Sequence, residues 1–151
     1  MRSHGRKRRP VNPPPTGVLY DRLHFSQATR VGDMIWVSGQ VGVDASTMTP
    51  ADGMEAQARL AFEGVRAVLE AGGASLGDIV ELTTFHTDLR GDMDAFSRVK
   101  DEYIAAPYPS WTAVGVGQLA LPELLVEIRA VAVVGCGDHT DRGCSGRSPA
   151  G

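Results

Sequence analysis

Two segments in the second half of the chain alternate between apolar and polar residues with a period of two, which is typical of β-strands. The pattern predicts one strand from Ser110 to Ala120 and another from Leu124 to Val134, with a break at residues 121–123 that contains Pro122. One face of the second strand carries Leu124, Val126, Ile128, Ala130 and Ala132. Glu127 lies on its other face, and a carboxylate in so apolar a strand must be solvated, paired or functional.

Further strands are predicted in the first half of the chain. Val18 to His24 has the pattern of a short edge strand, and Met34 to Val41 is rich in apolar and aromatic residues. Gly32-Asp33 is typical of a turn, so these two strands are expected to form a hairpin. Ile79 to Leu89 predicts a third strand, one face of which carries Val80, Leu82, Thr84 and His86.

Two segments have the spacing of amphipathic helices. The first follows Asp52, which forms a capping-box pattern with Glu55, and it ends at Gly72-Gly73. The second is expected to begin at Asp92 and to bury Met93, Phe96, Val99 and Tyr103. The order β-β-α-β-α-β-β predicts an α+β fold in which two helices cover one face of a mixed sheet. The other face has no covering layer, which favours self-association.

Composition places one domain between two tails. A chain of 151 residues is one domain by size, and we assign it to residues 16–135. Residues 1–15 are basic and then rich in proline, and residues 136–151 are poor in apolar residues, so both tails are predicted to be disordered. The C-terminal tail contains possible metal ligands, but their spacing matches no standard zinc pattern, so no metal site is predicted: Cys136, His139, Asp141 and Cys144.

Charge and hydropathy exclude some classes of function. No apolar run approaches the roughly 20 residues that span a bilayer, and no signal peptide is evident, so we expect a cytoplasmic protein without membrane contact. Residues 16–134 hold 8 Lys and Arg against 16 Asp and Glu, a net charge of −8. This argues against nucleic acid as a partner of the folded part. The basic run at residues 6–9 either contacts nucleic acid or is simply solvated.

Four features are candidates for chemistry. The glycine of Ser38-Gly39-Gln40 permits close approach of a ligand or backbone, or else marks a bulge. His86 is either an acid-base group near neutral pH or a half-buried histidine hydrogen-bonded to the backbone. Arg90 either binds an anion or is solvated. The apolar neighbours of Glu127 should raise its pKa unless Arg129 compensates.

Three segments together resemble the YjgF/YER057c/UK114 family, the reactive intermediate deaminases or Rid proteins. They are GDMIWVSGQVGVD (32–44), AQARLAFEGVRAVLEAGGASLGDIVELTTF (56–85) and YPSWTAVGVGQLALPELLVEIRAVAV (108–133). The resemblance covers about residues 18–134 and implies a chorismate-mutase-like α+β fold. It also implies a homotrimer whose sheets line a barrel, with ligand clefts between subunits. The implied activity is hydrolysis of small enamines and imines such as 2-aminoacrylate, without a metal or an organic cofactor.

The resemblance also implies roles for individual residues. Glu127 falls on the family's glutamate that positions or activates water, and Phe25 falls on its aromatic lid. Ser38 and Gly39, with Gln40, fall on a turn whose backbone and hydroxyl face the ligand. Trp111 stands where active imine deaminases have the arginine that clamps the substrate carboxylate, so the chain resembles an arginine-lacking subgroup.

Two functions follow as hypotheses. The first is an enzyme acting on a small enamine, imine or related carbonyl compound. In it Glu127 and His86 handle protons or water, Ser38 and Gly39 bind the polar end, Phe25 and Trp111 wall the pocket, and Arg90 is the candidate anion ligand. The alternative is a non-catalytic trimeric protein that binds a small molecule or a partner. Endoribonuclease activity, a third possibility associated with the family, is disfavoured by the acidic core.

Overall fold

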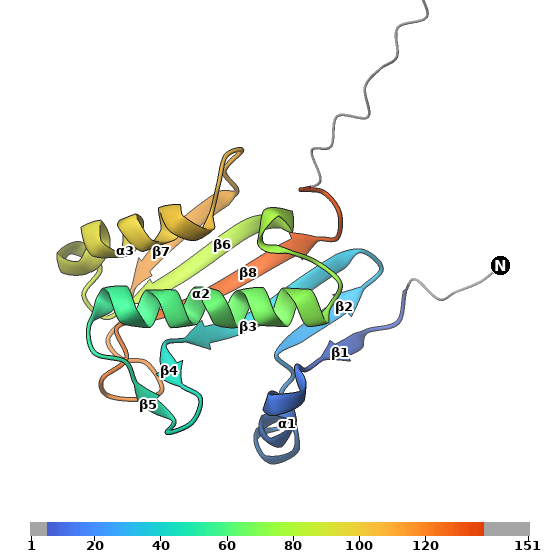
Figure 1. The fold of residues 1–151 in the computed structure, drawn as a ribbon, viewed down its shortest axis with the longest axis horizontal. Helices are drawn as coiled ribbons and strands as arrows, with labels where there is room; N and C mark the ends of the chain where they lie inside the picture. Colours follow the sequence, from blue (N-terminus) through green and yellow to red (C-terminus); the bar gives the residue numbers. More distant parts are fainter. Residues whose placement is uncertain (1–5, 138–151) are drawn as a thin grey trace, which may run out of the picture.

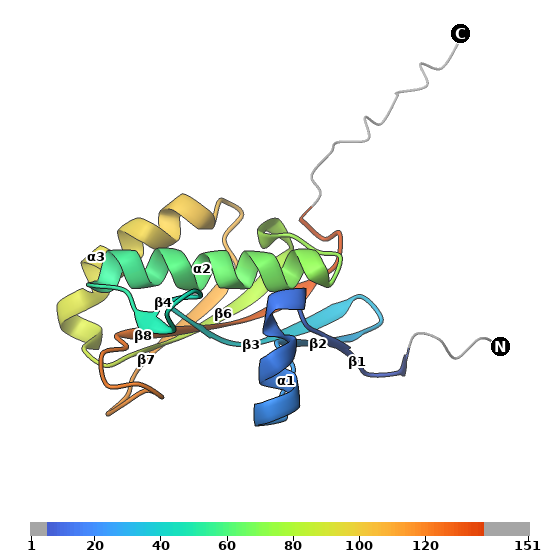
Figure 2. The ribbon, with the colours of Figure 1, turned by 60° about the horizontal axis from the view of Figure 1, so that its bottom comes forward.

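A six-stranded sheet with two long helices on one face forms the centre of the protein (Figures 1 and 2). The computed structural model describes residues 6–137. The strands of the sheet are β1 (Arg9–Val11), β2 (Ala28–Val31), β3 (Met34–Val41), β6 (Ile79–His86), β7 (Ser110–Gly115) and β8 (Val126–Val133). A small hairpin contains β4 (Val43–Asp44) and β5 (Thr49–Pro50), and the helices are η2 (Pro14–Thr16), α1 (Gly17–Leu23), α2 (Met54–Ala71), η3 (Leu76–Asp78) and α3 (Leu89–Tyr103).

The sheet is mixed, as the sequence predicted. Its spatial order is β1-β2-β3-β8-β6-β7, and β8 pairs antiparallel with both β3 and β6. β6 and β7 pair in parallel, and α3 connects them. β2 and β3 form a hairpin around the predicted turn at Gly32-Asp33, with Gly32 at a φ of +56°, but the strand that pairs with β3 is Ala28–Val31 and not the predicted Val18–His24. The segment between β3 and α2 contains the β4-β5 hairpin.

The alternation along β8 divides the two faces of the sheet. The five apolar residues predicted to share a face are all buried: Leu124, Val126, Ile128, Ala130 and Ala132. All of them except Leu124 belong to one core cluster with α2, to which α2 contributes Phe62, Val65 and Leu69. On β6 a register shift between Ile79 and Glu81 leaves Val80 exposed, so of the four residues predicted to share a face only Leu82, Thr84 and His86 are buried together. The uncovered face predicted from the sequence therefore lies opposite α2 and α3 (Figure 2).

The helix starts differ from the predicted caps. α2 begins after Gly53, which has a φ of +87° and caps the helix without a side-chain bond, so the predicted cap at Asp52 is wrong. α3 begins at Leu89 and is capped by Asp88, whose Oδ1 accepts a hydrogen bond of 3.3 Å from the Gly91 N–H. Asp92 lies in the first turn instead, because β6 ends at His86 and the helix starts sooner than predicted.

The N-terminal part required the largest correction. Val18 to His24, predicted as a strand, lies mainly in helix α1, and residues 9–11 of the supposedly disordered arm form the edge strand β1. β1 is held by its pairing with β2, by Val11 packing against the core, and by Asn12, whose Oδ1 accepts from the Gln27 N–H at 2.9 Å. Residues 1–5 of the arm and residues 138–151 of the C-terminal tail, including His139, lie outside the described residues.

A buried glutamine connects α2 to the segment before β8. Gln57 Nε2 donates hydrogen bonds to the carbonyls of Ala51 (2.9 Å) and Glu123 (2.8 Å), and its Oε1 accepts one from the Leu125 N–H (2.8 Å). Gly42 lies directly against the Gln57 backbone, where a β-carbon would collide with it. These contacts position the start of β8, which is two residues shorter at its N-terminal end than predicted.

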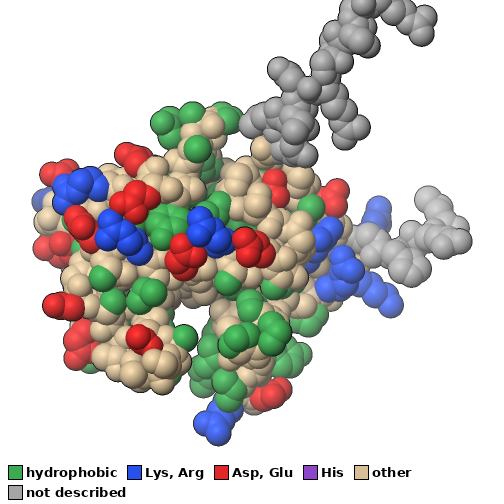
Figure 3. Space-filling view, in the orientation of Figure 1, with side chains coloured by type: hydrophobic (Ala, Val, Ile, Leu, Met, Phe, Trp, Pro, Cys, Tyr) green, Lys and Arg blue, Asp and Glu red, His purple; other side chains and the backbone are tan. Residues whose placement is uncertain are grey.

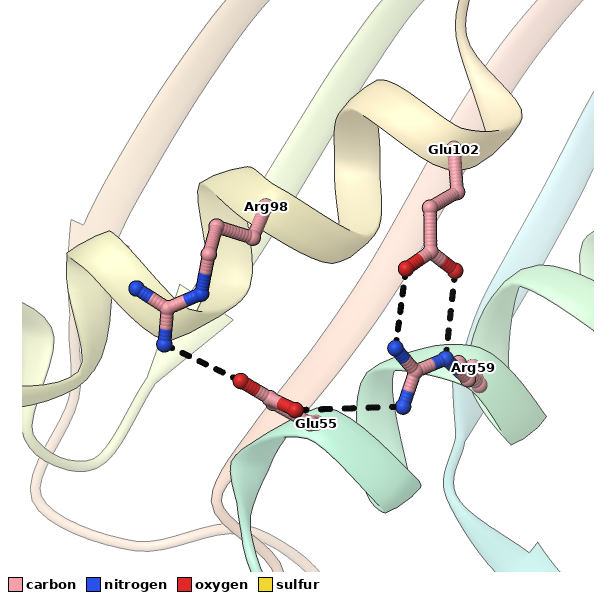
Figure 4. Close-up of polar contacts among 4 residues, drawn as sticks. All are labelled: Glu55, Arg59, Arg98 and Glu102. Carbon is pink, nitrogen blue, oxygen red and sulfur yellow. Dashed lines mark hydrogen bonds and ion pairs between the residues drawn. The ribbon is translucent and has the colours of Figure 1, made fainter.

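Ion pairs join α2 to α3 on the outer surface (Figure 4). Arg59 binds Glu102 through two hydrogen bonds of 3.1 and 2.8 Å, and Glu55 accepts from Arg98 at 3.0 Å. Glu55 also lies 3.9 Å from Arg59, so the four residues form one network. All four side chains are exposed, so the pairs orient the two helices more than they stabilise them.

Candidate functional site

Glu127 lies near the middle of the sheet, on the face away from α2 and α3. It is paired with Val41 on β3 and with Phe85 on β6. Its side chain is half-buried, and this burial raises the pKa of its carboxyl group. Within the described chain its carboxylate has neither a hydrogen bond nor an ion pair, and Arg129 on the same face does not pair with it. The predicted rise in pKa is confirmed, and an uncompensated carboxyl group faces the open side of the sheet.

Gly39 makes room for this carboxyl group. The pairing of β3 with β8 shifts register between Val37 and Gln40, so the chain forms a bulge at Ser38-Gly39. A β-carbon built on Gly39 would lie 2.5 Å from Glu127 Cδ and 2.7 Å from its Oε1. The interpretation of this glycine as a bulge is therefore confirmed, whereas close approach of a ligand or a backbone segment stays a prediction. The group that approaches is the Glu127 side chain.

Ser38 next to it has a defined hydrogen-bonding state. Its Oγ donates to the Ser26 carbonyl at 2.7 Å, and its N–H donates to the Gln27 carbonyl at 2.8 Å. Because the hydroxyl hydrogen is used internally, Ser38 Oγ can offer only its lone pairs to a ligand. Gln40 faces α2, where it approaches Gly64 and donates to Gln27 Oε1 at 2.9 Å, so it supports the bulge from the core side.

A groove of about 480 Å³ begins at Ser38 and runs toward the N-terminal edge of the sheet. Its lining residues come from the segments around β1, α1, β2 and β3: Arg8, Pro10, Tyr20, His24, Phe25, Ser26, Thr29 and Ser38. Thr29 and Ser38 follow the buried residues Ala28 and Val37, so they point away from the helices, toward the face that carries Glu127. The structure thus brings Phe25 and Ser38 together, as the family resemblance implied.

Arg8 and His24 were not among the residues selected from the sequence. Arg8 belongs to the basic run that was predicted either to contact nucleic acid or to be solvated, although the nearby Pro10 and Val11 could have indicated an edge strand. His24 ends α1 in the left-handed conformation, with a φ of 58°, and its N–H donates to the Tyr20 carbonyl at 3.1 Å. This turn brings His24 and Phe25 to the same groove.

His86 and Trp111 lie on the opposite face, under α3. Trp111 Nε1 donates to Thr84 Oγ1 at 2.9 Å, and Thr84 Oγ1 lies 2.7 Å from His86 Nε2. Phe96 of α3 packs edge-on against His86 and tilted against Trp111. Burial lowers the pKa of His86, an effect that the charge of Asp92 only partly opposes. The structure therefore separates both residues from Glu127, and His86 is a core histidine bonded to a side chain rather than to the backbone.

Arg90 also stands apart from the groove. It lies in the first turn of α3 with an exposed side chain, and it does not line the groove that Ser38 and Phe25 share. Among residues 6–137 no cluster of three or more His, Cys, Asp or Glu has the arrangement of a metal site. Cys144, one of the possible ligands noted in the tail, lies outside these residues. No helix within them is long and apolar enough to cross a membrane.

Comparisons with known proteins agree with this architecture. Residues 19–134 match the family described as endoribonuclease L-PSP. The RutC family protein YjgH of Escherichia coli strain K12 is 45% identical over 103 residues, which cover 68% of this chain and 78% of that protein. A 2-iminobutanoate/2-iminopropanoate deaminase of Dermatophagoides farinae is 32% identical over 126 residues, which cover 83% of this chain and 92% of that protein.

The fold is also that of solved structures. A structure of YjgH has a TM-score of 0.76 and 41% identity, over 84% of this chain and 96% of that one. The α+β fold predicted from the sequence is thereby confirmed, including the mixed sheet with two helices on one face.

Proposed function

Since the chain belongs to the Rid family, which is also called the YjgF or L-PSP family, we propose that it hydrolyses a small enamine or imine to a carbonyl compound and ammonia. The observation that carries this proposal is the half-buried, unpaired Glu127 carboxyl group beside the Gly39 backbone. Matched proteins named as deaminases of 2-iminobutanoate and 2-iminopropanoate support the reaction class.

In the proposed reaction Glu127 acts on water. Its carboxylate accepts a proton while the water oxygen bonds to the carbon of the C=N group, and the nitrogen takes up a proton to give a carbinolamine. The hydroxyl proton then passes by way of the Glu127 carboxylate to the nitrogen as the C–N bond breaks, which releases ammonia and leaves a C=O group. An enamine first becomes an imine by protonation at carbon. A carboxyl group whose pKa is raised by burial suits this exchange better than a surface carboxylate does.

We further propose that Trp111 binds no substrate carboxylate. An indole offers no cation, and its N–H is already donated to Thr84. We therefore expect 2-aminoacrylate, whose carboxylate is attached directly to the reacting group, to be hydrolysed slowly. Loss of a charge-assisted contact costs roughly two orders of magnitude in rate.

We also propose that the protein works as a homotrimer. Apolar side chains are exposed on the uncovered face or beside it, among them Met34 (40%), Val114 (37%) and Leu23 (64%). A sheet face with this composition needs a covering layer, and further copies of the chain would supply it. The alternative function, a trimeric protein that binds a small molecule without turnover, uses the same assembly.

Glu127→Gln tests the enzymatic proposal, because the amide keeps the volume of the side chain but cannot accept a proton. Imines are generated in situ by amino-acid oxidases from a panel of amino acids, and keto acid release is followed. We expect turnover to fall at least a hundredfold with the oligomer intact. Unchanged turnover in an intact oligomer would exclude Glu127 as the base, and no turnover of any substrate by the native protein would favour the binding function.

A further inference from the structure

The groove beside Ser38 combines a cationic end with apolar and hydroxyl-bearing walls. Arg8 and His24 are its basic residues, whereas Tyr20, Phe25 and Pro10 supply apolar surface. None of its eight lining residues is acidic. Figure 3 shows Lys and Arg side chains gathered beside the N-terminal end of the described chain, although the domain as a whole is acidic.

Arg8 is free to bind a ligand. Within residues 6–137 its guanidinium forms no hydrogen bond or ion pair, whereas Arg30 on the next strand is engaged by Gly32, Gly72 and Asp33. Arg8 immediately precedes β1, so the pairing of β1 with β2 limits the movement of the Arg8 backbone. A guanidinium held beside a groove is suited to two parallel hydrogen bonds with a carboxylate.

The distance between Arg8 and Glu127 sets the size of a ligand that contacts both. Their strands are separated by β2 and β3, so the two backbones are on the order of 14 Å apart across the sheet at about 4.8 Å per strand. The pairing also puts Arg9 level with Ala132, so Arg8 and Glu127 are offset by a further distance of roughly 20 Å along the strands. Glu127 does not line the groove, but its carboxyl group lies against Gly39, the residue after Ser38. A carbon that reacts beside Glu127 and an anionic group at Arg8 must therefore be several bonds apart.

We propose that the groove is an anion subsite in which Arg8, assisted by His24, binds a carboxylate that is distant from the reacting C=N or C=O carbon of the substrate. The substrate class is then an imine or enamine with its acidic group at the far end of a short chain. This inference rests on the proposed function for the position of the reacting carbon. It also agrees with slow hydrolysis of 2-aminoacrylate, whose carboxylate is too close to its reacting carbon to reach Arg8.

Binding of stable carbonyl compounds tests the subsite without turnover. The probes are 6-oxoheptanoate, 2-heptanone, which replaces its carboxylate by a methyl group, and pyruvate, whose carboxylate is adjacent to the carbonyl. Dissociation constants are measured by NMR titration of the full-length native protein and of Arg8→Gln, with Arg9→Gln as the matched control. Arg9 lies on the same edge but lines a different hollow, with Arg30 and Gly72, so its substitution removes the same charge from the opposite face.

We expect the native protein and Arg9→Gln to bind 6-oxoheptanoate at least tenfold more tightly than 2-heptanone and pyruvate. Arg8→Gln should lose this preference while binding 2-heptanone as before, and the Ser38 and Thr29 amide signals should move on binding to the native protein. Three outcomes would each overturn the proposal. The two variants could lose affinity for 6-oxoheptanoate equally, or the native protein could bind it no more tightly than 2-heptanone. Pyruvate could also bind as tightly as 6-oxoheptanoate in a manner that depends on Arg8. Circular dichroism confirms that both variants fold. If Glu127→Gln keeps full turnover while the Arg8-dependent preference remains, the proposed function fails and the subsite stands.

Discussion

Replacing Gly39 by alanine should displace the carboxyl group of Glu127, the proposed base, while leaving the fold intact. The new β-carbon would lie 2.5 Å from Glu127 Cδ and 2.8 Å from its Cγ, both too close for contact between carbon atoms. The side chain that must move is half-exposed and flexible, so it can turn away at a cost of less than about 1 kcal/mol in the free energy of unfolding. The proposed base would then be displaced from the position in which it is proposed to act on water.

Two other glycines provide matched controls. At Gly42 a β-carbon would meet the backbone of Gln57, and α2 cannot yield as a side chain can. Gly42→Ala should therefore lower the free energy of unfolding by about 1–3 kcal/mol or more, which corresponds to a fall in melting temperature of roughly 2–4 °C per kcal/mol. At Gly17, in α1, nothing lies within 4 Å of the new atom, so Gly17→Ala should be neutral or slightly stabilising.

The measurement is a comparison of melting temperature and turnover across the three variants. Gly39→Ala should reduce turnover about a hundredfold, the lower end of what a general base contributes, with a change in melting temperature of only a few degrees. Gly42→Ala should show the reverse, with a lower melting temperature and nearly native turnover below it. Native turnover in Gly39→Ala would refute the assignment of Glu127, because the structure leaves its carboxyl group no room to remain where it is.

Three further predictions concern Glu127, Trp111 and the oligomer. Burial raises the pKa of Glu127 above its value in the unfolded chain, so its contribution to stability is complete below the unfolded pKa and is lost as the pH rises through the folded pKa. Glu127→Gln should therefore melt at a higher temperature than the native protein at pH 8, with the difference shrinking toward pH 4; a constant difference would show that desolvation is not the cause. Trp111→Arg should lower the melting temperature by several degrees without accelerating 2-aminoacrylate hydrolysis. The substitution removes the hydrogen bond to Thr84 and places a guanidinium near Lys100, whose Nζ lies 4.8 Å from the centre of the indole. A gain in rate would contradict the placement of Trp111 away from the substrate. Analytical ultracentrifugation at micromolar concentration should give three times the chain mass of 16.0 kDa, and a mass of one or two chains would rule the trimer out.

The sequence predicted the central strands and helices well because their patterns are long and strongly periodic. Buried positions alternate along the whole of β8 and recur at helical spacing over several turns of α2. The helix α2 also ends at the glycines where the sequence predicted its end. The prediction for the N-terminal segment was wrong because α1 spans only seven residues and β1 only three. Elements so short take their conformation from tertiary contacts, such as the bond from Gln27 to Asn12, which a local pattern does not contain.

The candidate site was predicted in part for a related reason. Alternation placed Glu127 on the uncovered face, and the resemblance added Ser38, Gly39 and Phe25. The sequence could not show that Trp111 and His86 lie on the other face. The face on which a side chain lies depends on the register of its strand, and a shift of one residue exchanges the two faces. Arg8 was missed because a basic run is usually solvated, and only the pairing of β1 with β2 brings it to the groove.

The bulge in β3 determines whether Ser38 and Glu127 can act on one ligand. Val37 and Gln40 both face the helices although they are three residues apart, which a regular strand forbids. The extra residue is Gly39, and it allows both Ser38 and Val41 to lie on the open face, where Val41 pairs with Glu127. In a regular strand Ser38 and Val41 would lie on opposite faces, so the groove that starts at Ser38 and the Glu127 carboxyl group would be separated by the sheet. The irregular pairing, rather than any single side chain, therefore joins the proposed anion subsite to the proposed base.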